Sequence, residues 1–106
     1  MKITQLGKEL SKDKYVIDLK AKSFSTTEHN LVLDFSDEHG WVFDTGSYCT
    51  FDTCSDCTFK TGSDCTFKTG SCCVAVRRDI YEVIEIPEGK KIRINGYLIK
   101  GWKEVE

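Results

Sequence analysis

Proline is almost absent from this chain: Pro87 is the one proline in 106 residues, which argues against a proline-rich linker or disordered tail. A long apolar run is also missing, which excludes a typical transmembrane helix. The formal net charge of −2 is too small to predict a nucleic acid or a membrane as partner. The first residues lack the apolar stretch of a signal peptide, so we expect a cytoplasmic protein whose thiols stay reduced.

Histidine is scarce, and the chain contains no recognisable catalytic or cofactor motif. His29 and His39 each follow a glutamate in a turn-like segment, where we expect solvent-facing polar side chains. The basic pairs 77–78 and 90–91 are too few to predict nucleic-acid binding. We therefore expect a protein that is not an enzyme and that uses no cofactor.

What the chain does contain is an eight-residue repeat over residues 42–73. Its four units read VFDTGSYC, TFDTCSDC, TFKTGSDC and TFKTGSCC. Phenylalanine holds one column of the repeat and cysteine holds another. A short fixed period with an aromatic residue in register predicts a chain that coils and stacks on itself. The expected fold class is mainly β, a short β-solenoid in a single domain that spans residues 1–106.

The octads also predict which side chains face the interior. Side chains two positions apart share one side of a strand, so the Phe, Thr, Ser and Cys columns fall together and the more polar columns face solvent. The expected core ladder consists of Phe35, Phe43, Phe51, Phe59, Phe67, Cys49, Cys57, Cys65 and Cys73. The Gly-Ser pairs are expected to form corners, because glycine tolerates unusual dihedral angles. Cys54 replaces this glycine in one octad and predicts a strained or differently turned corner.

Charge pairing favours a coil of sixteen residues, made of two octads. With eight residues per coil, Asp44 would lie over Asp52 at a strand spacing of about 4.8 Å, and such like-charge pairs are unfavourable. With sixteen residues per coil, Asp44 stacks on Lys60 and Asp52 stacks on Lys68 as surface pairs of opposite charge. The rival arrangement is an intertwined trimer with eight residues per chain in each turn. The sequence therefore leaves monomer and homo-oligomer open.

The same register extends into both flanks of the repeat. It predicts the inner ladders Phe35–Phe51–Phe67–Val83, Phe43–Phe59–Ala75, Trp41–Cys57–Cys73 and Cys49–Cys65–Tyr81. Large aromatic side chains would thus replace cysteine at both ends of the cysteine ladders and close the interior.

Residues 1–41 and 74–106 are expected to form caps on the repeat. Ile3, Leu6 and Leu10 stand at helical spacing and predict a short helix within residues 1–14. Strands are expected at 15–19 and 31–35, with a turn over 23–30. At the other end, alternating apolar residues predict a C-terminal hairpin that turns at 95–96 and returns through 97–102.

Six cysteines are many for this length, and three interpretations are open. Cys54 and Cys57 have the spacing of a zinc knuckle, and the other thiols could supply further ligands or form disulfides. The octad, however, already explains four cysteines as small apolar side chains stacked in a line, whereas zinc needs a tetrahedron. We favour structural thiols with no bound metal. Cys54 and Cys72 fall on the outward side and are the expected exposed thiols.

The units TFDTCSDC and TFKTGSDC resemble the cysteine-containing octapeptide repeats of small phage and bacterial proteins of uncharacterised function. The resemblance extends to the flanking segments YVIDL and VAVRRDIYEVIEIPEG. It implies a bacterial host cell as the setting but assigns no role to any residue.

From these observations we expect a non-enzymatic module that binds another protein, and a phage-encoded inhibitor of a bacterial host protein is its most specific form. The alternative is a structural subunit or fragment of a phage particle or fibre that assembles through the solenoid.

Overall fold

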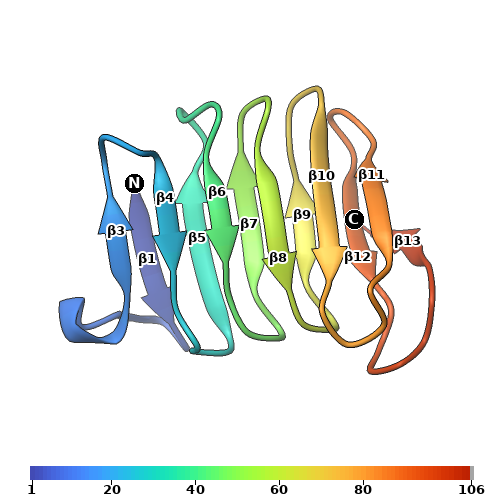
Figure 1. Ribbon diagram of the computed structural model, residues 1–106, viewed down its shortest axis with the longest axis horizontal. Helices are drawn as coiled ribbons and strands as arrows, with labels where there is room; N and C mark the ends of the chain where they lie inside the picture. Colours follow the sequence, from blue (N-terminus) through green and yellow to red (C-terminus); the bar gives the residue numbers. More distant parts are fainter. Residues whose placement is uncertain (106) are drawn as a thin grey trace.

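The computed structural model describes residues 1–105, which form two β-sheets that face each other across one core (Figure 1). The chain winds between the sheets in coils of about sixteen residues, for about three turns, so the fold is a β-solenoid. Its extents are 32 × 25 × 25 Å. Among residues 1–105, no helix is long and apolar enough to span a membrane.

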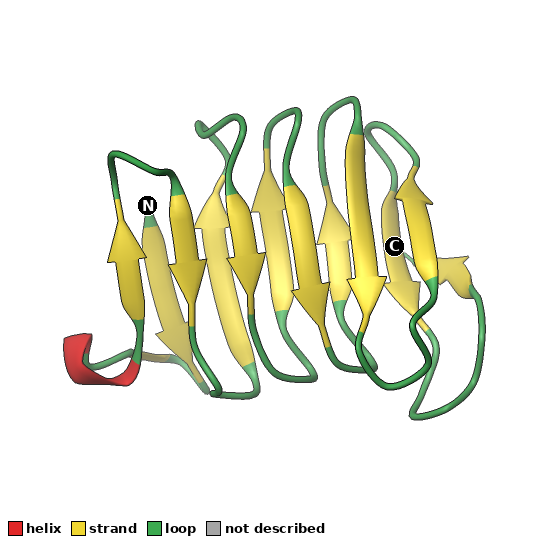
Figure 2. Ribbon diagram, in the orientation of Figure 1, coloured by secondary structure: helices red, strands yellow, loops and turns green. Residues whose placement is uncertain are grey.

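Thirteen strands and one short 3-10 helix make up the two sheets and their caps (Figure 2). Sheet A contains, in spatial order, β13 (Trp102–Glu104), β12 (Lys91–Ile94), β9 (Thr66–Lys68), β7 (Thr50–Thr53), β5 (Leu31–Phe35), β1 (Lys2–Gln5) and β2 (Lys8–Glu9). Sheet B contains β11 (Val83–Ile86), β10 (Cys73–Arg77), β8 (Thr58–Thr61), β6 (Val42–Asp44), β4 (Ser23–Ser25) and β3 (Val16–Asp18).

The octads alternate between the sheets because each one supplies a strand and a corner. In β7 and β8 the phenylalanine and the following threonine are buried, while Asp52 and Lys60 are exposed. Phe43 stacks on Phe59 with ring centroids 5.2 Å apart and planes within 8°. Each buried phenylalanine stabilises the fold by about 1.5–3 kcal/mol, so these rings supply much of the driving force.

The predicted register holds within the repeat but not at its first coil. Phe43 pairs with Phe59 and Phe51 with Phe67, each sixteen residues apart. In the coil before them, Leu33 pairs with Phe51, and Phe35 lies opposite Thr53. The expected Phe35–Phe51 step is therefore wrong, because the connection from β5 to β6 adds two residues. Phe35 is still buried, and its ring packs edge-on against Trp41 and Phe43.

The N-terminal cap is made of strands, and the helix expected within residues 1–14 is wrong. Strands β1 and β2 form a hairpin whose turn is Leu6-Gly7, and both residues have positive φ. Two successive positive φ values favour this tight hairpin turn over a helix. Within residues 1–105, the sole helical element is η1 (Lys12–Lys14). The expected turn over 23–30 contains a further strand, β4.

Antiparallel strands also close the C-terminal end. Strand β11 folds back on β10, and β12 lies antiparallel to β9, so the parallel winding stops here. The expected ladder positions of Val83 and Tyr81 are wrong: Val83 lies opposite Val76 and is exposed, and Tyr81 is 85% exposed in the turn. The C-terminal hairpin exists, but residues 95–101 form a longer loop and β13 is its second strand.

The corners of the coils depend on glycine for space, not for its dihedral angles. The residues with positive φ are Tyr48, Asp56, Asp64 and Cys72, two positions after each corner glycine or its Cys54 equivalent. At Gly70, by contrast, an added Cβ would lie 2.6 Å from Ser55 Oγ and 3.0 Å from the backbone of Cys54. The expectation of unusual glycine dihedrals is therefore wrong for Gly46, Gly62 and Gly70, none of which has a positive φ. A side chain at these positions would instead overlap the preceding coil.

Candidate functional site

The predicted core ladder lies inside the solenoid. The structure buries all five phenylalanines and all four cysteines of that set: Phe35, Phe43, Phe51, Phe59, Phe67, Cys49, Cys57, Cys65 and Cys73. The backbone N–H of Cys49 donates to Cys65 Sγ at 3.4 Å, and Cys57 N–H donates to Cys73 Sγ at the same distance. Trp41 heads the second of these ladders, because Trp41 O accepts the N–H that follows Cys57.

Two of these buried thiols, Cys57 and Cys65, are poor candidates for chemistry, whereas a hydrogen bond with Cys65 lowers the pKa of the fully buried Cys49 to about 7. Burial raises the pKa of the Cys57 thiol above its ordinary value. A hydrogen bond to Cys49, together with burial, raises the pKa of Cys65 well above the ordinary range. Both side chains therefore remain neutral thiols at neutral pH and lack the thiolate needed for nucleophilic attack. Across residues 1–105, no three His, Cys, Asp or Glu side chains converge as a metal site would require.

The two cysteines that were expected to be exposed differ in their surroundings. Cys72 is exposed and has a φ of 59°. Cys54 is half-buried. Its backbone is bonded to both neighbouring coils: its N–H donates to Glu38 O, and its carbonyl accepts from Gly70 N–H.

The two histidines have structural contacts that the sequence did not reveal. His29 Nδ1 accepts a hydrogen bond of 2.7 Å from Ser47 N–H, and His39 Nδ1 accepts one of 3.4 Å from Ser55 N–H. In the next coil, Ser47 Oγ accepts from Ser63 N–H in the same way. Each histidine therefore begins a ladder of side-chain acceptors that serine continues along the corner. Both rings are exposed, as expected, but they support backbone groups.

The surface charge pairs occupy the predicted register. Asp44 is the cross-strand neighbour of Lys60, and Asp52 is the neighbour of Lys68. The close ion pair of Asp44 is nevertheless with Arg78, whose Nη1 lies 2.7 Å from the carboxylate. Arg78 also donates to the carbonyls of Thr45 and Lys60, so it binds three acceptors near the carboxyl ends of β6 and β8.

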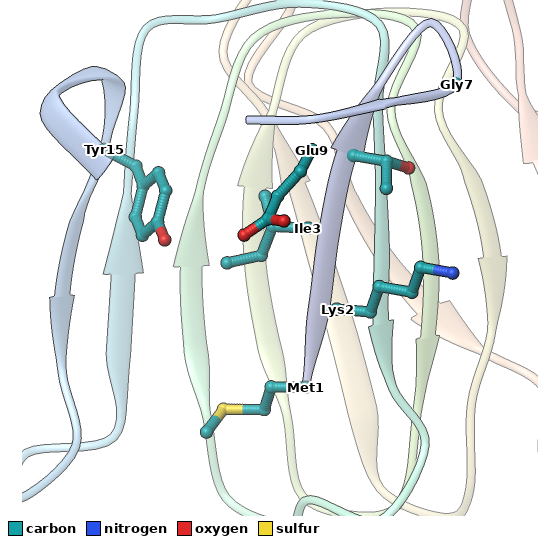
Figure 3. Close-up of a pocket in the computed structure, with 7 residues that line it drawn as sticks. Met1, Lys2, Ile3, Gly7, Glu9 and Tyr15 are labelled. Atoms are coloured by element: carbon teal, nitrogen blue, oxygen red, sulfur yellow. The ribbon is translucent and has the colours of Figure 1, made fainter. Parts of the chain in front are cut away.

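A hollow of about 400 Å³ lies at the N-terminal end of the solenoid (Figure 3). Ile3, Glu9 and Tyr15 point into the space between β1 and the segment before β3, and Lys2 points to the other side of β1. The residues that line the hollow include one carboxylate, Glu9, with no histidine, cysteine or second acid beside it. This arrangement can hold a small polar group but offers no paired acid and base.

The most elaborate polar arrangement lies at the opposite end, around Arg77. This side chain is fully buried on sheet B, next to the loop 95–101. Its Nη2 lies 2.6 Å from Asp79 Oδ2, and its Nη1 lies 3.6 Å from Glu82 Oε1. Its guanidinium also donates to the carbonyls of Gly96 and Ile99. A guanidinium is the group best suited to such a site, because its five donors can satisfy several acceptors at once.

The two acids that pair with Arg77 bind the same loop. Asp79 Oδ2 accepts a hydrogen bond of 2.9 Å from Leu98 N–H, and Glu82 Oε2 accepts one of 2.9 Å from Gly101 N–H. Burial opposes the ionised form of Asp79, but the bonds from Leu98 and Arg77 outweigh it and hold the Asp79 pKa below its ordinary value. The backbone of the loop is therefore fixed at four points by one charged network.

The side chains of this loop face outward. Tyr97, Leu98 and Ile99 are 70%, 56% and 60% exposed, although they are consecutive and apolar or aromatic. The loop projects beyond the sheets between β12 and β13 (Figure 1). Tyr97 also lines a shallow hollow with Tyr48, beside the histidine–serine corner. The sequence had placed these residues in a strand, and this expectation hid their exposure.

Arg77 could have been found from the sequence. It shares the inward side of β10 with Cys73 and Ala75, so the two-residue alternation already points its side chain toward the core. A charged residue at an inward position needs charged or polar partners. Residues 79 and 82 were the nearest acids in the chain.

No protein-family model, curated protein or solved structure matches this chain.

Proposed function

We propose that this protein is a non-enzymatic module that binds another protein through the loop 95–101. The observation that carries the proposal is the contrast between the backbone and the side chains of this loop. Its backbone is fixed by buried Arg77 and by Asp79 and Glu82, while three consecutive apolar or aromatic side chains project into solvent. A preorganised loop loses little conformational entropy on binding, so more of its contact energy appears as affinity.

Exposed apolar residues elsewhere, such as Leu6 and Val16, do not stand in a run of consecutive exposed apolar side chains. Leu6 and Val16 are 80% and 71% exposed, but each is separated from other exposed apolar side chains along its strand or turn. Scattered exposed apolar residues are common on protein surfaces and need no binding function. Leu98 and Ile99 stand next to Tyr97, and aromatic residues are frequent energetic centres of interfaces.

Binding is better supported than catalysis. The N-terminal hollow presents Glu9 without a second acid, and raised pKa values keep the Cys57 and Cys65 thiols neutral. Cys49 has a lowered pKa, but its side chain is fully buried in the core. The buried charges around Arg77 are used to fix the loop backbone, which suits a recognition surface.

The setting of this interaction follows from the repeat. Because the octads resemble those of small phage and bacterial proteins, we propose a partner in the bacterial cytoplasm and an inhibitory action on it. The alternative function, a structural subunit that assembles end to end, is less well supported. The edge strand β2 has two residues, both charged, and short charged edges discourage strand addition.

The proposal is tested by affinity capture from bacterial lysate with loop and control variants. The double substitution Leu98→Ala and Ile99→Ala should abolish capture of any specific partner and leave the unfolding temperature unchanged. The matched control, Leu6→Ala and Val16→Ala, removes a similar exposed apolar area at the other end and should capture the partner normally. Equal capture by both variants would contradict the assignment of the loop.

A further inference from the structure

We infer that the C-terminal end of the outer face of sheet A is a docking site for an acidic segment of a protein. The site consists of Lys68, Lys91, Arg93 and Lys103, and we call it the basic patch. The inference rests on the proposed function, because the patch adjoins the loop 95–101: Arg93 is two residues before that loop and Lys103 is two residues after it.

The register of sheet A places these basic residues directly beside one another. Lys91 on β12 is the cross-strand neighbour of Lys68 on β9, and Arg93 is the neighbour of Lys103 on β13. Neighbouring strands lie about 4.8 Å apart, and like charges in such pairs destabilise a sheet. All four side chains are exposed, so the fold keeps two unfavourable pairs on its surface.

Acidic residues within the molecule compensate this charge only weakly. Arg93 Nη2 has one partner, Asp64 Oδ1 at 3.5 Å. Among residues 1–105, no ion pair within 4.0 Å involves Lys68, Lys91 or Lys103. The nearby Lys90 differs, because its Nζ lies 4.0 Å from Glu104 Oε1. Lys91 and Lys103 are therefore free to bind external carboxylates, whereas Lys68 also has Asp52 as a cross-strand neighbour.

The rest of the same face is balanced. Asp34 and Asp52 are also like-charge neighbours, but Lys2 stands beside Asp34 and Lys68 beside Asp52. The row Lys2–Asp34–Asp52–Lys68 therefore carries no net charge, and Lys91 is the unmatched residue that follows it. A local conflict without internal compensation is what a binding surface shows before its partner arrives.

The shape and charge of the face favour a short acidic segment as the occupant. A shallow hollow of about 360 Å³ crosses the outer face of sheet A and reaches Lys68 and Lys91. Its other end is lined by Asp34 and Asp52, which would repel an extended polyanion such as a nucleic-acid backbone. A protein segment can place a few carboxylates on the basic patch and uncharged or basic residues over the acidic row.

The inference is tested with a fluorescent glutamate-rich peptide, with an oligothymidylate of equal charge as the competing class of ligand. At low ionic strength the peptide should bind saturably and more tightly than the oligothymidylate, and binding should weaken steeply as salt is added. Lys91→Glu combined with Lys103→Glu should weaken peptide binding by roughly tenfold or more. The control Lys12→Glu with Lys14→Glu makes the same charge change at the other end and should leave binding unchanged.

The unfolding temperature is a second measurement, which tests whether the two like-charge pairs are unfavourable within the protein itself. Lys91→Glu and Lys103→Glu convert both like-charge pairs into opposite-charge pairs, so the unfolding temperature should rise while binding is lost. An unchanged or lower unfolding temperature, equal loss in the control, or tighter binding of oligothymidylate at the same residues would overturn the inference. If partner capture fails for the loop variant but survives charge reversal, the proposed function stands and the acidic docking site falls.

Discussion

At the scale of single residues, each corner that contains a glycine of the repeat needs space at one position and a positive φ two positions later. Gly70 provides room for the serine of the preceding coil, whereas positive φ falls two positions later, at Cys72. The stacking of Ser55 on Ser71 depends on this room, because Ser71 N–H donates to Ser55 Oγ at 3.1 Å. Packing between coils thus requires glycine at position 70.

Gly70→Ala should lower the free energy of unfolding by about 1–3 kcal/mol, because the new methyl group would overlap Ser55 Oγ and the backbone of Cys54. Gly96→Ala is the matched control, since the nearest atom to its added Cβ lies 3.7 Å away. Urea denaturation of both variants measures the difference. An equal effect of the two substitutions would refute the packing explanation.

At the scale of elements, the loop 95–101 gains its order from β10 and the turn after it. Arg77 on β10 contacts two carbonyls of the loop, and Asp79 and Glu82 bind two of its amides. The neighbouring Arg78 points outward and pairs with Asp44 at 44% and 49% side-chain exposure. Two adjacent arginines therefore allow a buried and an exposed ion pair to be compared in one chain.

Arg77→Met should destabilise the protein by about 3–5 kcal/mol, because it leaves the buried carboxylate of Asp79 without its partner. It should also speed hydrogen exchange at the amides of Leu98 and Gly101, whose acceptors would lose their positions. Arg78→Met should cost less than about 1 kcal/mol and leave those amides protected. Slow exchange of Leu98 in the Arg77 variant would show that the network does not order the loop.

The same network predicts how stability depends on pH. The pKa of Asp79 is lower in the folded protein than its ordinary value of 3.8, so its ionised form favours folding. This stabilisation is complete above the unfolded-state pKa and is lost as the pH falls through the folded-state pKa.

Asp79→Asn should therefore flatten the decline in the free energy of unfolding below about pH 4, relative to the parent protein. Denaturation curves recorded from pH 7 to pH 2.5 provide the comparison. The control Asp18→Asn removes an exposed carboxylate far from the loop and should keep the parent slope. A steep decline that persists in the Asp79 variant would place the acid sensitivity elsewhere.

At the scale of the whole molecule, the repeat was readable from the sequence, whereas the caps were readable only in part: strands β3 and β5 and the C-terminal hairpin were expected, and the N-terminal hairpin was not. The two-residue alternation indicated the buried phenylalanines and cysteines, and the signs of Asp44 and Lys60 selected the coil of sixteen residues. The first coil departs from this period because of two added residues before β6, which no local pattern indicates. Leu33 thus takes the ladder place expected for Phe35.

Strand direction and loop exposure were beyond the reach of such patterns. Alternating residues around Val83 look the same in a parallel and an antiparallel strand, so the reversal of β11 against β10 was missed. Tyr97 and Ile99 were placed in a strand because they follow Asn-Gly. Their exposure depends on contacts with Arg77, which is far from them along the chain.

In this solenoid two octads make one coil, so consecutive octads belong to opposite sheets. Removal of residues 50–65 deletes one full coil and joins β6 to β9, which restores an octad of sheet A after one of sheet B. Removal of residues 50–57 deletes half a coil and sends every later strand to the opposite sheet, including the closing strands β11, β12 and β13.

The decisive measurement is cooperative unfolding in urea, followed by near-ultraviolet circular dichroism, for these two deletions. We predict that the variant lacking 50–65 keeps a cooperative transition and ordered aromatic signals, whereas the variant lacking 50–57 loses both. Equal folding of the two variants, or folding of the half-coil deletion alone, would contradict the two-octad coil.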